Sequence, residues 1–184
     1  MGVDREVNRR AVFLDRDGVL NASVVRAGRP YPPARVEDLE ILPGVPGALG
    51  QLKQAGFVLL VVTNQPDVGR GTLSREAVEA IHERMRAELP LDAIYSCYHD
   101  DRDRCACRKP APGMLFDGAR DWDVALPASF MVGDRWRDID AGAAAGCRTV
   151  FIDYQYDERQ PRAFDLKVTA LAEAVAWILG ESTT

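Results

Sequence analysis

Two aspartates separated by one residue follow a short apolar stretch near the start of the chain. Ala11–Leu14 leads directly into Asp15 and Asp17, and a glycine comes next. Such a pair can bind a divalent cation together with a phosphate group, because Mg²⁺ prefers carboxylate and phosphate oxygens. An aspartate can also attack phosphorus and become an aspartyl-phosphate. An acidic turn that only contacts solvent is the alternative that this motif leaves open.

Polar residues also follow three other apolar runs of the sequence. They are Thr63, Asn64 and Gln65 at the end of 57–63, Arg108 and Lys109 beyond 93–98, and Asp134 after 128–132. In an open α/β sheet, ligands bind beyond the carboxyl ends of the strands, so we expect these groups and the two aspartates to meet at one edge. Asp138, four residues after Asp134, would share a helix face with it. As an acid in the first turn of a helix, Asp138 would be favoured by the helix dipole.

Three cysteines and a histidine form a second cluster in the sequence, immediately before Arg108. They are Cys97, His99, Cys105 and Cys107. Thiolate and imidazole ligands suit a tetrahedral zinc ion, and four such ligands would make it a structural ion that fixes the loop before Arg108. A redox pair or a set of unrelated thiols is the alternative. Cys147 lies apart from the cluster, and we expect it to be a small buried residue.

The motif DRDGVLN, residues 15–21, resembles the first motif of the haloacid dehalogenase (HAD) superfamily of phosphotransferases. The resemblance extends in order through residues 63–65, 105–114 and 133–138. The pattern CxH…CxCRKPxPGM is similar to a narrower, capless and zinc-containing branch of that superfamily. This branch includes D-glycero-D-manno-heptose 1,7-bisphosphate 7-phosphatases and histidinol-phosphate phosphatases. The chain departs from the branch at Pro66-Asp67, at Arg135 and in its short zinc loop, and these differences bear on the substrate.

The resemblance implies magnesium-dependent hydrolysis of a phosphomonoester. Asp15 would be the nucleophile, and Asp17 would protonate the leaving oxygen and then activate the water that cleaves the aspartyl-phosphate. A carboxylate oxygen of Asp15, the backbone carbonyl of Asp17 and a carboxylate oxygen of Asp134 would bind Mg²⁺. The resemblance also implies that Asp138 supports this metal site, and an ordinary acid in the first turn of a helix is the alternative. Lys109 and the Thr63 hydroxyl would bind phosphoryl oxygens.

Arginines expected around the same edge favour a substrate with two phosphates, because a guanidinium binds phosphate through two parallel hydrogen bonds. The candidate substrate contacts are Arg16, Asn64, Gln65, Arg108 and Arg135, with Arg26, Arg29, Arg70 and Arg137 as further basic residues near the site. For Arg26 and Arg29, ordinary solvated charge is an equal alternative. The resemblance makes Arg108 the best candidate for the second phosphate. We therefore expect removal of the 7-phosphate of a heptose 1,7-bisphosphate, and histidinol phosphate or another small sugar phosphate is the alternative.

Apolar runs alternate with helical patterns along the chain. The expected strands are 11–14, 57–63, 93–98, 128–132 and 148–153, and the expected helices are 45–55, 74–89, 112–122, 137–145 and 168–179. This alternation predicts a mostly parallel sheet with helices on both faces. The resemblance implies a HAD-like Rossmannoid three-layer α/β sandwich. Residues 1–184 should form one domain without a separate cap, because 22–38 and 97–110 are only loop-sized.

Composition excludes several classes of protein. The 184 residues are 47% hydrophobic and carry a formal net charge of −5. This balance argues against a nucleic-acid partner, and no apolar run approaches the ~20 residues that span a bilayer. We expect a cytoplasmic monomer whose cysteines are thiols or metal ligands. A zinc-stabilised binding module without catalysis and a nucleic-acid end-processing protein remain as the other classes.

Overall fold

Strand β1 (Ala11–Leu14) lies inside a six-stranded sheet in which every neighbouring pair of strands is parallel. The computed structural model describes residues 9–181, and the strand order is β5-β4-β1-β6-β7-β8. The remaining strands are β4 (Val58–Asn64), β5 (Ala93–Cys97), β6 (Phe130–Gly133), β7 (Arg148–Ile152) and β8 (Leu166–Val168). The carboxyl ends of β1, β4 and β6 therefore lie side by side.

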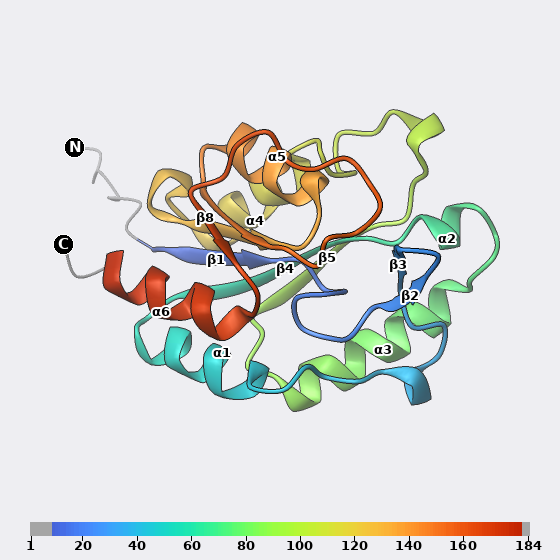
Figure 1. The fold of residues 1–184 in the computed structure, drawn as a ribbon, viewed down its shortest axis with the longest axis horizontal. Coiled ribbons are helices and arrows are strands. Elements are labelled where there is room, and N and C mark those ends of the chain that lie inside the picture. The colour runs from blue at the N-terminus through green and yellow to red at the C-terminus, as the bar shows by residue number, and fades with distance from the viewer. Residues whose placement is uncertain (1–8, 182–184) are drawn as a thin grey trace, which may run out of the picture.

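Five long helices cover the sheet in two layers. Helices α1 (Val45–Gln54), α3 (Arg75–Glu88) and α6 (Leu171–Glu181) lie on one face, and α4 (Gly113–Trp122) and α5 (Trp136–Ala145) lie on the other (Figure 1). The three-layer α/β architecture expected from the sequence is confirmed.

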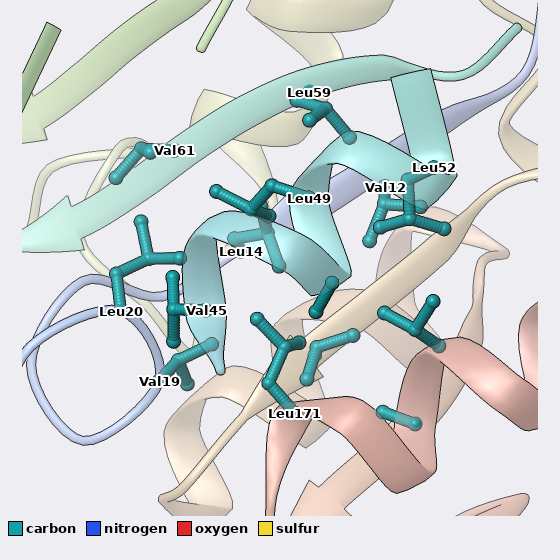
Figure 2. Close-up of a cluster of buried hydrophobic side chains, with 14 of the residues drawn as sticks. Val12, Leu14, Val19, Leu20, Val45, Leu49, Leu52, Leu59, Val61 and Leu171 are labelled. Carbon is teal, nitrogen blue, oxygen red and sulfur yellow. The ribbon is translucent and has the colours of Figure 1, made fainter. Parts of the chain in front are cut away.

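The hydrophobic core is divided between the two faces because successive side chains of a strand point to opposite sides of a sheet. Val12 and Leu14 of β1 pack in the cluster beneath α1 and α6, where Leu49 and Leu171 contribute (Figure 2). Phe13 belongs to the second cluster, beneath α4 and α5. All four residues of β1 are fully buried, so the strand that precedes Asp15 is held from both sides.

Several short elements surround the carboxyl edge of the sheet. They are the hairpin β2 (Val24–Arg26) and β3 (Arg29–Tyr31), helix α2 (Pro66–Gly69) and the 3-10 helix η2 (Asp101–Asp103). Two further 3-10 helices lie elsewhere: η1 (Val36–Asp38) packs against α3, and η3 (Leu126–Ala128) precedes β6 at the amino edge. The backbone N–H of Asp157 donates to the carbonyl of Gly28 at 2.9 Å. The hairpin tip is therefore attached to the loop that follows β7.

The expected boundaries differ from the structure mainly near the C-terminal end of the described residues. The helix expected over 168–179 is α6, which begins at Leu171, because residues 166–168 instead form edge strand β8. The Asp165 carboxylate accepts a hydrogen bond from the Thr149 backbone at 2.6 Å and so anchors this edge. Ser74 is the N-cap of α3, since its hydroxyl accepts from the Ala77 N–H at 3.1 Å. Within residues 9–181, none of the helices has the length and apolar character needed to cross a bilayer.

Candidate active site

The carboxyl edge of the sheet opens into a cavity of about 420 Å³. Asp15 follows β1, Asn64 ends β4 and Asp134 follows β6, and all three line the cavity. The expected convergence of polar residues at one edge is therefore observed for these three strands. Lys109, from the loop after β5, reaches the same cavity.

Lys109 is the centre of a buried ionic cluster. Its ammonium Nζ lies 2.7 Å from Asp15 Oδ1, 2.7 Å from Asp138 Oδ1 and 2.7 Å from the Val62 carbonyl oxygen. Burial opposes the charge on Lys109, but the two carboxylates outweigh burial and raise its pKa to about 12. Burial and the negative charge of Asp138 raise the pKa of Asp15 to about 6 despite the opposing ammonium. Lys109 is thus a permanent cation in contact with the expected nucleophile.

Asp134 has a different environment, because neither of its buried carboxylate oxygens has a hydrogen-bond partner among the described residues. Burial and repulsion from Asp15 and Asp138 raise its pKa well above the ordinary value. Oxygen atoms of these three acids lie within 4.8 Å of one another. Unpartnered carboxylate oxygens in an oxygen-only donor set fit a hard divalent cation such as Mg²⁺. Asp138 Oδ2 also accepts from the Arg135 backbone N–H at the start of α5, as an acid in the first turn of a helix does. Because α5 begins at Trp136, Asp134 lies before the helix and the two acids do not share a helix face.

Gly18 is required in the turn that follows Asp17, where the backbone passes close to Asp134. Its backbone has φ +85°, and a Cβ at this position would lie 2.0 Å from Asp134 Oδ2. Glycine therefore allows both the left-handed turn and the close approach of the Asp134 carboxylate.

Asp17 lines the cavity, and its carboxylate accepts hydrogen bonds from three buried side chains. Arg16 Nη2 donates to Asp17 Oδ2 at 3.0 Å, while Asn21 Nδ2 and Gln65 Nε2 each donate to the carboxylate at 2.9 Å. The expected substrate contact of Arg16 is corrected, because its side chain is 0% exposed and does not line the cavity. Gln65 is also buried, and its amide contacts Asp17 and the Thr63 hydroxyl instead of the cavity.

Asn64 fixes the segment that carries Lys109. Its Nδ2 donates to the Lys109 carbonyl at 3.0 Å, and its Oδ1 accepts from the Lys109 backbone N–H at 3.0 Å. This two-way pairing joins the end of β4 to the loop beyond β5. Asn64 therefore fixes the backbone from which the Lys109 side chain extends, in addition to lining the cavity.

The outer wall of the cavity is rich in arginine. Its arginines are Arg29, Arg70, Arg108, Arg135 and Arg137. Most are paired with acids: Arg108 and Arg137 contact Asp101 at 2.8 and 3.2 Å, Arg70 contacts Asp100 at 2.8 Å, and Arg135 pairs with Glu158. Arg26 is not part of the wall and stacks on Tyr31.

The Cys/His cluster has the geometry of a four-ligand metal site. Cys107 Sγ lies 3.1 Å from Cys97 Sγ, 3.4 Å from Cys105 Sγ and 3.3 Å from His99 Nδ1. A tetrahedral site with Zn–S bonds of ~2.3 Å has edges of about 3.8 Å, so these contacts are close to the spacing that zinc requires. Burial raises the pKa of the Cys97 thiol, whereas hydrogen bonds from Cys107 and from backbone N–H groups outweigh burial at Cys105 and lower its pKa to about 7. The cluster can hold zinc next to Arg108, and Cys147 is buried, as expected.

One residue near the site was not anticipated. The side chain of His82 is 1% exposed, and its Nε2 lies 3.1 Å from Arg16 Nη1. The two residues are 66 positions apart, so no local spacing connects them.

Comparison with known proteins identifies the family. A family model described as HAD-hydrolase-like matches residues 106–176. The chain is 33% identical to D-glycero-beta-D-manno-heptose-1,7-bisphosphate 7-phosphatase of Helicobacter pylori over 175 residues, which covers 92% of this chain and 97% of that protein. It is 39% identical to the enzyme of the same name from Rhodopseudomonas palustris over 150 residues, which covers 75% of this chain and 80% of that protein.

A solved structure is similar over nearly the whole length. It is the D,D-heptose 1,7-bisphosphate phosphatase of Bordetella bronchiseptica complexed with magnesium and phosphate. The TM-score is 0.79 at 34% identity, and the match covers 94% of this chain and 99% of that one. On this similarity and the site geometry, the chain belongs to the heptose 1,7-bisphosphate phosphatase family of HAD-like hydrolases.

Proposed function

We propose that this chain is a magnesium-dependent phosphatase that removes the 7-phosphate of D-glycero-D-manno-heptose 1,7-bisphosphate through an aspartyl-phosphate on Asp15. The observation that carries the proposal is the contact of Lys109 with Asp15 and Asp138 at 2.7 Å, beside the unpartnered Asp134 carboxylate. A bare group of buried carboxylates would repel a phosphate. The lysine and a cation in the acidic cluster offset this repulsion and make attack by a carboxylate feasible.

Each residue at the site has its own role in the proposed reaction. Asp15 Oδ attacks phosphorus, and the bond to the leaving sugar oxygen breaks as the aspartyl-phosphate forms. Asp17 lines the same cavity two residues later and donates a proton to the leaving oxygen, then accepts one from the attacking water. Lys109 stays charged throughout because its pKa is raised to about 12. Backbone N–H groups at the cavity bind phosphoryl oxygens. The Thr63 hydroxyl, expected from the sequence to do the same, is buried, does not line the cavity and accepts from Gln65 Nε2 at 3.0 Å.

Two metal sites belong to the proposal. Asp15, Asp134 and the backbone carbonyl of Asp17 would bind Mg²⁺, with Asp138 supporting the site, and the ion would supply charge neutralisation at the phosphate. Cys97, His99, Cys105 and Cys107 would bind a structural zinc ion. The zinc ion would hold the loop from which Arg108 and Lys109 extend.

The arginine wall supports a substrate with a second phosphate. Arg108 extends from the loop next to the Cys/His cluster, and with Arg135 it is our candidate for binding the distal phosphate. Arg108 and Arg135 now pair with acidic side chains. When the substrate binds, each would contact phosphate instead, and this exchange is favourable because a guanidinium binds phosphate through two parallel hydrogen bonds. We further propose that residues 1–184 act as one domain, as a cytoplasmic monomer on a small phosphorylated sugar, without a nucleic-acid or membrane partner.

A substrate comparison tests the proposal. Phosphate release with Mg²⁺ is measured for heptose 1,7-bisphosphate, histidinol phosphate and p-nitrophenyl phosphate at equal enzyme concentration. The expected result is the highest kcat/KM for the heptose bisphosphate and loss of release in Asp15→Asn. Asp153→Asn is the matched control, because Asp153 follows β7 but does not line the cavity, and it should remain active. Faster turnover of histidinol phosphate refutes the substrate, and unchanged release by Asp15→Asn refutes the mechanism.

A further inference from the structure

The buried, charged guanidinium of Arg16 contacts two other side chains. Nε and Nη2 donate to the two oxygens of Asp17 at 3.2 and 3.0 Å, and Nη1 lies 3.1 Å from His82 Nε2. Its side chain is 0% exposed, so these contacts replace the solvent that a free guanidinium would have. If one of these partners is removed, a buried N–H donor of Arg16 is left without an acceptor, and this costs free energy.

The His82 ring can act only as an acceptor toward Arg16. A guanidinium has donors and no acceptor, so Nε2 carries the lone pair and Nδ1 carries the proton. Nδ1 has no hydrogen-bond partner among the described residues, and the Glu79 carboxylate lies 3.7 Å from it, beyond hydrogen-bond length. Burial and the charge of Arg16 lower the pKa of His82 to about 4, against the opposing effect of Glu79, so the ring is neutral near pH 7.

We infer that His82 is a positioning residue for the reaction: by accepting from Nη1 it fixes the plane of the Arg16 guanidinium, which in turn aims the Asp17 carboxylate. The inference rests on the proposed function, because Asp17 is the proposed proton donor to the leaving oxygen. His82 itself lies behind Arg16, does not line the cavity and contacts no reacting atom. Without the acceptor, Nη1 is left buried and unpaired, and the guanidinium rotates away from the fork geometry that it makes with Asp17.

Leaving-group chemistry separates this role from a general loss of structure. A sugar alkoxide needs a proton as it departs, whereas p-nitrophenolate leaves without one. Misplacement of Asp17 should therefore slow the heptose bisphosphate and leave the first turnover of p-nitrophenyl phosphate nearly intact. A distorted fold would slow both substrates equally.

The experiment compares three variants with the wild type. His82→Leu removes the acceptor, His82→Gln restores one at a similar reach, and Ile81→Val is the control at an adjacent buried position of α3. His82→Leu should lower kcat for the heptose bisphosphate by about 10- to 100-fold, as loss of a supporting hydrogen bond typically does. Its KM should change less than about twofold, because substrate binding is not affected. His82→Gln should recover most of the loss, and Ile81→Val should match the wild type.

A double-mutant cycle completes the test. Asp17→Asn alone should lower kcat by about 10²- to 10⁴-fold, and adding His82→Leu to it should change nothing more, because both changes act through the same carboxylate. An additive effect, an equal loss in the first-turnover rate of both substrates, or a His82→Leu enzyme as active as Ile81→Val overturns the inference. An inactive wild type or an active Asp15→Asn instead refutes the proposed function. In that case a crystal structure of His82→Leu still decides the inference, since an unmoved Arg16–Asp17 pair overturns it and a displaced pair supports it.

Discussion

Replacing Lys109 by methionine keeps the length of the side chain and removes a positive charge buried between Asp15 and Asp138. The ammonium is 1% exposed and makes three contacts at 2.7 Å, so the change leaves two carboxylates without their cation. Breaking a buried ion pair on one side costs about 3–5 kcal/mol. We expect a value near the lower end, because a carboxyl with a pKa of about 6 can take up a proton when its cation is removed.

The expected loss of stability in Lys109→Met is large enough to measure by thermal unfolding. A cost of about 3 kcal/mol corresponds to a Tm lower by about 6–12 °C for a chain of this length. The loss should shrink at about pH 5, where protonation of Asp15 relieves the unpaired charge. Phosphatase activity should be lost at every pH, because the cation that faces the nucleophile is absent.

Lys53→Met is the matched control for this prediction. Lys53 contacts Asp92 at 2.8 Å, nearly the same distance, but its side chain is 36% exposed. An exposed pair contributes at most about 1 kcal/mol, so the Tm should fall only slightly. Equal Tm losses in the two variants, or a Lys109→Met loss that does not depend on pH, would refute the argument that burial gives the Lys109 cluster its strength.

The remaining predictions concern the two metal sites and the turn beside them. Since the pKa of Asp15 is raised from 3.8 to about 6, its favourable contribution to stability is present at low pH and is lost as pH rises through about 6. Mg²⁺ should therefore raise the Tm more at about pH 7.5 than at about pH 5, and an equal shift contradicts competition between protons and metal. Metal analysis should find zinc in the purified protein, and Cys105→Ser or chelation should lower the Tm by several degrees; protein purified without zinc would reject the structural site. Gly44→Ala should cost about 1–2 kcal/mol because its φ is positive, and Gly18→Ala should cost more, because its added Cβ also clashes with Asp134. Only Gly18→Ala should abolish the Mg²⁺ response, since its Cβ would meet Asp134 at 2.0 Å while that of Gly44 meets nothing within 4 Å.

The sequence was most informative where a pattern is local. Three of the four apolar runs that precede site residues became buried strands, whereas β5 is mostly half-buried. Parallel strands place the residues that follow them at one edge of the sheet. The Cys/His cluster was readable for the same reason, because its four members lie close together in the chain. Short strands such as β8 (Leu166–Val168) were missed, since three residues are too few to show an alternating pattern.

Side-chain orientation in the site could not be read from the chain. Arg16 is one of several arginines near the motif, and nothing local distinguishes a buried guanidinium from one on the cavity wall. Its placement depends on His82, which α3 brings from 66 positions away. The pairing of Asn64 with the Lys109 backbone, 45 positions apart, was equally inaccessible. Contacts between residues so far apart in the sequence form only after the sheet has folded and brought their loops together.

The hydrogen bond from Asp157 to the carbonyl of Gly28 has a consequence for attempts to change which sugar fits the cavity. The hairpin that carries Arg29 and the segment that carries Glu158, the partner of Arg135, are joined at this bond and cannot move independently. A chimera that receives only the hairpin of a relative would pull Glu158 away from Arg135 and disturb two parts of the rim at once. Transplants of both segments together should preserve the rim, so the two must be exchanged as one unit.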